Sequence, residues 1–293
     1  MGRVLQPLRS LGAEAVGERL PFTLHGAPLR GGEVTVDVPS AQVKSALLLA
    51  GLRCDRALTV VQHTPTRDHT EGMLPLFGAH VDAEPGAVTV YPGALHGAEI
   101  DVFGDPSSAA FLVVAALLVP GSQLVLNNVG LWPRRTGFLR ALAEAGAEIE
   151  VLSRRTSCGD LLVCSRPLQA FEITPNDVPD LVDEVPVLAL AAALAQGTGL
   201  AELRLKESDR VAATAKMLQS LGVEVALTED ELTIVGTDDL RGHADCDHDD
   251  HRLAMTAAIA RLVSGEALPK DVPAAAISWP GFLDDLRSVT AQA

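Results

Sequence analysis

A turn built on glycine recurs four times in this chain, each time after a segment with helical character. The turns are Leu11-Gly12-Ala13, Phe77-Gly78-Ala79, Ala145-Gly146-Ala147 and Leu221-Gly222-Val223, so the glycines lie 66, 68 and 76 residues apart. Glycine is the residue that most readily adopts the left-handed conformation just past a helix end. Self-similarity at a nearly constant spacing is typical of repeated structural units. The chain is therefore restricted to folds built from copies of one unit.

Each copy also contains a second, very apolar helix. After a glycine turn come alternating β-rich segments, such as residues 223–227 and 232–235, and then the apolar helix. These helices are expected to start near Ser40, Ser107, Asp183 and Asp250. Helices this apolar are enclosed by other elements. We therefore predict an α/β fold of repeated α/β units, with buried helices and mixed sheets.

A change of composition at residues 102–106 predicts a hinge between two domains. We expect one domain over residues 1–104 and a second domain of three repeat units over residues 105–293. Met1 falls at or just before the first helix of a copy whose opening strand is missing. The first domain is therefore expected to be N-terminally incomplete.

The composition restricts the class of partner. Hydrophobic residues make up 47% of the 293 residues and aromatic residues only 3%, so the core must consist of Ala, Val and Leu. A formal charge of −15 without a basic run argues against nucleic acid as a partner. The four cysteines form no C-x-x-C pair, and the apolar runs are too short to span a bilayer. We therefore expect a cytoplasmic protein without a membrane partner.

Reactive side chains gather at the expected helix starts. A helix N-terminus favours anions, yet Lys206 and Arg210 place cations at one such start, which is the kind of local conflict expected at a functional site. If the units stack by a rotation, several helix starts converge on one cleft suited to a ligand with more than one negative charge. The segments concerned are Ser40-Ala41-Gln42, Thr66-Arg67-Asp68-His69, Asp183-Glu184, Lys206-Glu207-Ser208-Asp209-Arg210 and Asp250-His251-Arg252.

Structural interpretations of the same residues remain open. Ser40 is also a common N-cap residue, Asp183 can compensate a helix dipole, and residues 66–69 can form a capping turn. Glu207 and Arg210 have the spacing of an ion pair on a helix surface. Residues 246–251 resemble a metal-binding run, but no matching second pair of ligands follows, so we predict no metal. Without a nucleophile motif or a phosphate loop, Lys and Arg remain for anion binding, and Asp and Glu for proton transfer.

Five segments together resemble the 5-enolpyruvylshikimate-3-phosphate synthase (3-phosphoshikimate 1-carboxyvinyltransferase) family in order and spacing. The resemblance covers the whole chain, and the Lys-Glu-Ser-Asp-Arg and Asp-His-Arg-Leu-Ala-Met strings are highly specific. It implies a two-domain enolpyruvyl transferase-like fold of three similar units per domain. The segments are residues 40–45, 66–70, 183–184, 206–210 and 250–255.

The resemblance implies transfer of the enolpyruvyl group of phosphoenolpyruvate to the 5-hydroxyl of shikimate 3-phosphate, a step of aromatic amino-acid biosynthesis, with no cofactor. It implies that Asp183 is the base for the hydroxyl proton, and that Glu207, with Lys206, handles the proton at the methylene carbon. Arg210 and Arg252, with Gln42, are expected to bind phosphoenolpyruvate. Expected contacts to shikimate 3-phosphate are Ser40, Ala41, Gln42, Thr66, Asp183 and Lys206, with Arg67, Asp250 and His251 in support.

Two departures from the family pattern shape the alternatives. The resemblance starts about a third of the way through the family, and no lysine precedes Ile277-Ser278-Trp279-Pro280, where some members have one. One alternative is a truncated, non-catalytic paralogue or fragment that binds an anionic ligand or a partner. Another is UDP-N-acetylglucosamine enolpyruvyl transferase, which shares the fold and the chemistry. We expect the family enzyme to be a monomer.

Overall fold

The computed structural model describes residues 1–195, 200–203, 209–228 and 231–290. The chain forms two compact units, Met1–Asp101 and Val102–Ala293, called here the first and the second unit. The division falls three residues before the domain boundary expected from the sequence. Each unit has its own cluster of buried hydrophobic side chains.

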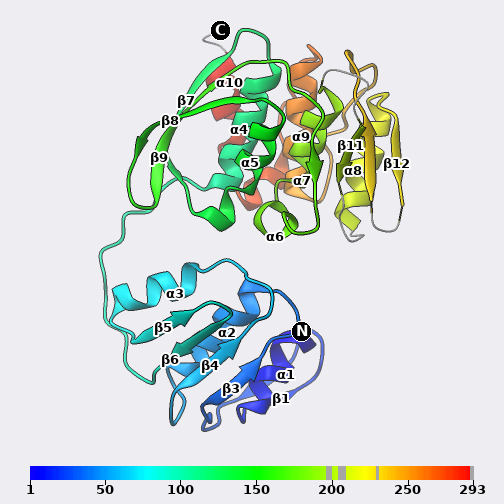
Figure 1. Cartoon of the computed structure of the whole chain (residues 1–293). Coiled ribbons are helices and arrows are strands. Elements are labelled where there is room, and N and C mark those ends of the chain that lie inside the picture. Colours follow the sequence, from blue (N-terminus) through cyan, green and yellow to red (C-terminus); the bar gives the residue numbers. More distant parts are fainter. Residues whose placement is uncertain (196–199, 204–208, 229–230, 291–293) are drawn as a thin grey trace. The chain divides into compact units, whose positions relative to one another are not determined.

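The first unit is built around one four-stranded sheet (Figure 1). The sheet has the strand order β3-β4-β6-β5, in which β3 and β4 are parallel and the other neighbours antiparallel. The core lies between this sheet and α2, with Leu47 and Leu48 fully buried. The elements are α1 (Gly2–Ser10), β1 (Glu14–Val16), β2 (Thr23–His25), β3 (Gly32–Thr35), α2 (Ala41–Gly51), β4 (Leu58–Val61), α3 (His69–Met73), the 3₁₀ helix η1 (Leu74–Phe77), β5 (Val81–Glu84) and β6 (Ala87–Val90).

The second unit places helices between two sheets (Figure 1). One sheet has the order β7-β9-β8 and the other the order β10-β11-β13-β12. The elements are α4 (Pro106–Leu118), β7 (Gln123–Gly130), η2 (Pro133–Arg135), α5 (Gly137–Glu144), β8 (Glu148–Arg154), β9 (Cys158–Cys164), β10 (Glu172–Ile173), α6 (Val178–Leu181), α7 (Val185–Ala193), β11 (Leu200–Leu203), α8 (Asp209–Ser220), β12 (Val225–Leu227), β13 (Leu232–Val235), α9 (His251–Val263), η3 (Pro273–Ile277) and α10 (Phe282–Thr290).

The predicted repeat is confirmed by strand topology. The sheet β10-β11-β13-β12 has the order and strand directions of β3-β4-β6-β5, with one parallel pair followed by two antiparallel ones. The sheet β7-β9-β8 fits the same scheme. Its two strand pairs are antiparallel, and Gly104 forms a parallel bridge with Val129 of β7 at the position of the missing first strand. The glycines of the four turns all have positive φ, between +79° and +101°. The prediction of repeated α/β units with mixed sheets is therefore confirmed.

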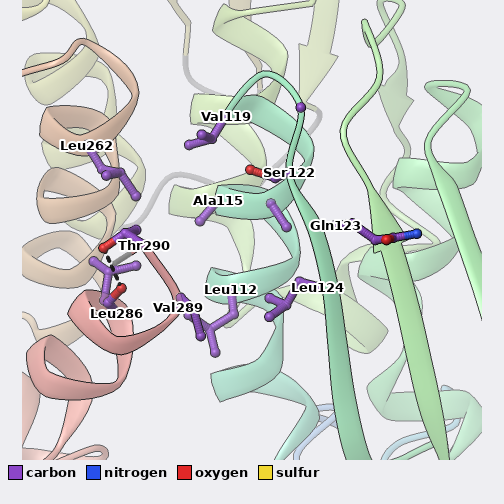
Figure 2. A pocket seen from close by; sticks show the side chains of 12 residues that line it. Leu112, Ala115, Val119, Ser122, Gln123, Leu124, Leu262, Leu286, Val289 and Thr290 are labelled. Carbon is purple, nitrogen blue, oxygen red and sulfur yellow. Dashed lines mark hydrogen bonds between the residues drawn. The ribbon is translucent and has the colours of Figure 1, made fainter. Parts of the chain in front are cut away.

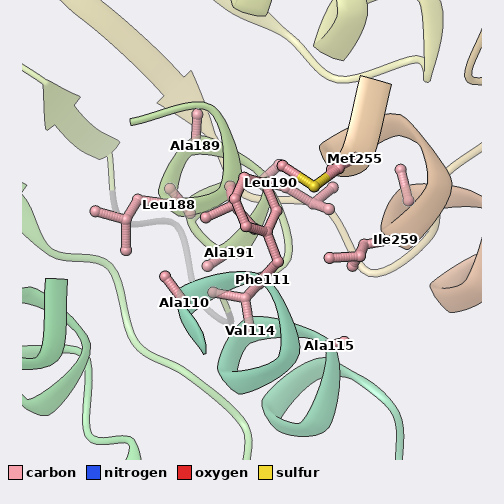
Figure 3. Close-up of a cluster of buried hydrophobic side chains, with 14 of the residues drawn as sticks. Ala110, Phe111, Val114, Ala115, Leu188, Ala189, Leu190, Ala191, Met255 and Ile259 are labelled. Carbon is pink, nitrogen blue, oxygen red and sulfur yellow. The ribbon is translucent and has the colours of Figure 1, made fainter. Parts of the chain in front are cut away.

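Three buried helices, α4, α7 and α9, form the core of the second unit. Figure 3 shows Phe111 and Val114 of α4 against Leu190 of α7 and Ile259 of α9. Ala, Val and Leu dominate this cluster, as the composition required. Aromatic side chains close it at the C-terminal end of the chain, where Phe282 packs edge-on against Phe111 and Trp279, with ring centroids 6.4 and 5.3 Å apart.

The buried helices begin close to the predicted positions. α2 and α9 follow the N-cap residues Ser40 and Asp250, as expected. α4 begins one residue before Ser107, because Asp105 accepts a hydrogen bond from Ser108 N and Pro106 occupies the first helical position. α7 begins two residues after Asp183, because the short helix α6 precedes it. Within the described residues, no helix is both long and apolar enough to cross a membrane.

Candidate functional site

The N-terminal ends of α4, α7 and α9 lie together in the second unit. Ser107, in the first turn of α4, donates a hydrogen bond to Glu184 Oε1, at the N-cap position of α7, and both side chains are buried. Asp183, the residue before Glu184, contacts Arg252 in the first turn of α9. Of the segments that the sequence predicted to converge, the structure brings together those that contain Asp183, Arg210 and Arg252. Three positive helix ends at one place attract anions.

Asp183 lies between two arginines. Its Oδ1 is 3.3 Å from Arg252 Nη2 and 3.7 Å from Arg210 Nη1. All three side chains are partly buried, with 19% of Asp183 and of Arg252 exposed and 29% of Arg210. They are thus shielded enough for strong electrostatic interaction and still reachable from solvent. Cations and a carboxylate that converge in this way can bind an anion and accept a proton at neighbouring points.

Asp250 holds both α9 and Arg210. Its carboxylate accepts hydrogen bonds from Arg252 N at 2.8 Å and Leu253 N at 3.4 Å, which caps α9, and from Arg210 Nε at 2.8 Å. Burial alone would raise the pKa of Asp250, but these hydrogen bonds and the Arg210 charge outweigh burial and lower the pKa. Asp250 therefore remains ionised and fixes the Arg210 guanidinium beside Asp183.

His251 orients the second arginine. Its Nε2 accepts a hydrogen bond from Arg252 Nη1 at 2.8 Å, which requires an unprotonated Nε2. Burial and the neighbouring Arg252 charge lower the pKa of His251. The Arg252 guanidinium is thus held between a neutral imidazole and the Asp183 carboxylate, with fixed orientation.

Part of the predicted cluster lies outside the described residues. Lys206 and Glu207 belong to residues 204–208, so their predicted roles remain predictions. The helix they were expected to open is present as α8, and Arg210 lies in its first turn.

In the first unit, a second polar cluster joins two of the predicted segments. Ser40 caps α2 by accepting a hydrogen bond from Val43 N at 3.4 Å, which supports its N-cap interpretation. Thr66 Oγ1 donates to Gln62 Oε1 at 2.8 Å, and Gln62 Nε2 donates to the carbonyl of Ser40 at 3.4 Å. Ser40, Gln62 and Thr66 are all buried. The structure therefore brings Ser40 and Thr66 together through Gln62, which the sequence did not single out.

The remaining predicted residues of this unit lie around that cluster. Ala41 and Gln42 form the first turn of α2, with Ala41 half-buried and Gln42 exposed. Arg67 is half-buried, two residues before the start of α3. Asp68 occupies the N-cap position of α3 without a side-chain capping bond, so the capping-turn interpretation of residues 66–69 gains no support from it.

Several polar contacts were not foreseen. Lys44 of α2 forms an ion pair with Glu71 of α3, and Ser107 pairs with Glu184 as described above. At the start of α4, Arg135 binds the capping residue Asp105, much as Arg210 binds Asp250 at the start of α9. A lysine inside an otherwise apolar helix was the available signal for the first of these contacts. Nothing local in the sequence distinguishes the other pairs.

An apolar pocket of about 460 Å³ lies away from these clusters (Figure 2). Its walls come from the C-terminal half of α4, the start of β7 and the ends of α9 and α10, for example Leu112, Leu124 and Val289. None of the predicted site residues that the structure describes lines it. Among the described residues, there is also no group of three or more His, Cys, Asp or Glu side chains placed to hold a metal ion.

Comparison with known protein families gives one extended match. The family model described as EPSP synthase (3-phosphoshikimate 1-carboxyvinyltransferase) matches residues 1–286.

Two relatives named 3-phosphoshikimate 1-carboxyvinyltransferase illustrate the similarity. The chain is 46% identical over 305 residues to the protein from Synechococcus sp. (strain RCC307), a match that covers 98% of the chain and 70% of that protein. It is also 46% identical over 303 residues to the protein from Desulforudis audaxviator (strain MP104C), covering 99% of the chain and 71% of the relative.

Solved structures agree. EPSP synthase from Acinetobacter baumannii superposes with a TM-score of 0.85 at 33% identity, covering 99% of this chain and 70% of that one. The enolpyruvyl transferase NikO from Streptomyces tendae has a TM-score of 0.77 at 18% identity, covering 98% of this chain and 70% of that one, which shows similarity of fold alone.

Proposed function

The chain belongs to the EPSP synthase (3-phosphoshikimate 1-carboxyvinyltransferase) family, and we propose that it transfers the enolpyruvyl group of phosphoenolpyruvate to the 5-hydroxyl of shikimate 3-phosphate. The products are 5-enolpyruvylshikimate 3-phosphate and phosphate. This reaction belongs to the shikimate pathway, which supplies chorismate and the aromatic amino acids.

The observation that carries the proposal is the convergence of Arg210 and Arg252 on Asp183. Phosphoenolpyruvate has a carboxylate and a phosphate, and guanidinium groups bind both kinds of anion with two parallel hydrogen bonds. We assign Arg210 and Arg252 to phosphoenolpyruvate, and the family resemblance implies the same role for Gln42. Asp250 and His251 support them by orienting the two guanidinium groups.

Asp183 is the proposed base. As the 5-oxygen of shikimate 3-phosphate bonds to C2 of phosphoenolpyruvate, Asp183 takes the hydroxyl proton, and C3 gains a proton to give the tetrahedral intermediate. Loss of phosphate from C2 and of a proton from C3 then restores the double bond. We assign the proton at C3 to Glu207, with Lys206, as the family resemblance implies.

The polar cluster of the first unit is the proposed site for shikimate 3-phosphate. Free N–H groups in the first turn of α2 and the hydroxyls of Ser40 and Thr66 are suited to a phosphate or to sugar-like hydroxyls. Ala41 and Gln42 contribute from the same turn, and Arg67 supplies nearby positive charge. The family resemblance also implies contacts from Asp183 and Lys206.

We also propose that the protein acts in the cytoplasm as a monomer, without a metal or organic cofactor. Its reaction requires an acid, a base and several fixed cations, which the assigned side chains supply. Two small anionic molecules are then its only partners in catalysis.

The test is a calorimetric titration with shikimate 3-phosphate, followed by phosphoenolpyruvate, alongside an assay of phosphate release. We expect binding of both ligands and turnover, and loss of turnover with retained binding of phosphoenolpyruvate in the Asp183→Asn variant. Turnover with UDP-N-acetylglucosamine as acceptor would assign the chain to the other enolpyruvyl transfer. Binding of an anion without turnover would favour a non-catalytic protein, and a folded chain that binds neither substrate would contradict the proposal.

A further inference from the structure

Two polar contacts join α2 to α3 side by side. Lys44 Nζ lies 2.5 Å from Glu71 Oε1, and Ser45 Oγ lies 2.6 Å from Thr70 Oγ1. The two pairs come from consecutive residues on each helix, so they fix both the separation and the register of the helices. We refer to these four residues as the α2–α3 clamp.

The α2–α3 clamp attaches one end of residues 62–71 to α2, and hydrogen bonds attach the other end. Gln62 binds the carbonyl of Ser40 at the start of α2, and Thr66 binds Gln62. Four residues after Thr66, the clamp ties Thr70 and Glu71 to the same helix one turn further along. Residues 62–71, which include Thr66 and Arg67, are thus attached to α2 at both ends.

Stability alone does not account for a buried ion pair at this position. Only 5% of the Lys44 side chain and 8% of the Glu71 side chain are exposed. Glu71 Oε2 is buried and makes no hydrogen bond, so the carboxylate is only half satisfied. Desolvating two charges offsets most of their attraction, and apolar residues of similar volume are often as stabilising or more so. An ion pair favours one mutual orientation of the two helices, whereas an apolar pair does not.

We propose that Lys44 and Glu71 are positioning residues for the acceptor substrate. The pair holds residues 62–71 on α2 so that Thr66 and Arg67 keep a fixed geometry relative to Ser40 and Gln42. This inference rests on the proposed function, since those four residues are the ones assigned to shikimate 3-phosphate or to its support.

The decisive variant replaces both charges, Lys44→Met with Glu71→Met. Because it leaves no unpaired buried charge, its melting temperature is expected to equal or exceed that of the parent chain. Hydrogen–deuterium exchange of peptides covering residues 62–71 is expected to rise in the unliganded protein. The Kd and KM for shikimate 3-phosphate are expected to rise about tenfold, with the KM for phosphoenolpyruvate unchanged. Faster exchange and weaker binding at an unchanged or higher melting temperature indicate a positioning role. A merely structural role would lower the melting temperature as well.

A matched control uses an exposed ion pair. Arg166 and Glu148, 3.4 Å apart and about 60% exposed, are replaced by Met in the same way. Their loss is expected to leave exchange of residues 62–71 and both KM values unchanged. If the Lys44/Glu71 double variant fails to fold, Ser45→Ala with Thr70→Val removes the uncharged half of the clamp at nearly constant volume. That variant is expected to change exchange and affinity in the same direction.

The outcomes separate this inference from the proposed function. Unchanged exchange of residues 62–71 in a folded clamp variant overturns the inference, and so does faster exchange with unaltered affinity for shikimate 3-phosphate. If the parent chain does not bind shikimate 3-phosphate, the proposed function fails. In that case, faster exchange in the variant still establishes that Lys44 and Glu71 position residues 62–71. Unchanged exchange overturns the inference together with the proposed function.

Discussion

Arg210 and Arg252 are both paired with acidic side chains. Asp183 contacts both guanidinium groups, and Asp250 binds Arg210 from the other side. We propose that an anion bound by these two arginines competes with the Asp183 carboxylate for them.

Arg252→Lys tests this geometry at the level of one side chain. Lysine keeps the charge but lacks the planar pair of donors that binds a carboxylate or phosphate in two places. We expect the KM for phosphoenolpyruvate to rise about tenfold to a hundredfold, equivalent to about 1.5–3 kcal/mol for a hydrogen bond to a charged group. The Kd for shikimate 3-phosphate is expected to stay unchanged. An equal rise for both substrates would place Arg252 elsewhere in the mechanism.

The lowered pKa of His251 predicts that the stability of the chain depends on pH. Its pKa is lowered in the folded chain, so the unfolded state binds the proton more readily. Above the unfolded pKa of about 6.5, both states are neutral and His251 contributes no pH dependence. As the pH falls below that value towards the folded pKa, the parent chain loses stability relative to the His251→Gln variant. Urea denaturation of both proteins between pH 8 and pH 5 measures the difference, and parallel curves would contradict the prediction.

At the scale of elements, the described part of the chain shows the same sheet pattern three times with different side chains. The sheets β3-β4-β6-β5 and β10-β11-β13-β12 share their strand order, and the third sheet completes the pattern through Gly104. The glycine turns and the apolar helices of these units could be predicted because each rests on local chemistry. A left-handed turn needs glycine, and a helix enclosed on all sides needs apolar residues throughout.

What could not be predicted depends on residues far apart in the chain. Ser107 and Glu184 are 77 residues apart, and Lys44 and Glu71 are 27 residues apart. A serine or an acid at a helix start has the same local signal whether it caps that helix or binds a neighbouring one. The pairing of Asp183 with both arginines is of this kind. The identities of the site residues could thus be proposed from the sequence, whereas their partners required the fold.

Alanine substitutions at two glycines distinguish the cost of backbone strain from the cost of a steric clash. Gly146 has φ +80° and open space where a Cβ would lie, so Gly146→Ala is expected to cost about 1 kcal/mol through the left-handed backbone alone. A Cβ at Gly242 would lie 1.7 Å from the carbonyl oxygen of Ser220, so Gly242→Ala is expected to cost about 3 kcal/mol or more. Denaturant unfolding of the two variants compares these costs, and equal losses would contradict the distinction.

At the scale of the whole molecule, the two units have separate cores. The cluster around Leu47 belongs entirely to the first unit, and the cluster around Leu142 entirely to the second. The expected division into two domains, residues 1–104 and 105–293, remains a proposal. The two separate clusters of buried hydrophobic side chains support it.

Calorimetry of two cavity variants tests that independence. Leu47→Ala and Leu142→Ala each remove a fully buried side chain, one from each core, at an expected cost of about 2–5 kcal/mol. We expect the parent chain to unfold in two transitions, of which each variant lowers one. A single transition that both variants shift equally would show that the units unfold as one cooperative body.

The aromatic packing described above has an optical consequence. Both tryptophans of the chain, Trp132 and Trp279, belong to the second unit, and the single tyrosine, Tyr91, belongs to the first. Trp132 packs edge-on against Phe103, and Trp279 packs against Phe282. Selectively excited indole emission therefore reports on the second unit alone. The chain thus carries its own spectroscopic label for the unit that holds Asp183, Arg210 and Arg252, and the ligand binding proposed there can be followed without an added dye.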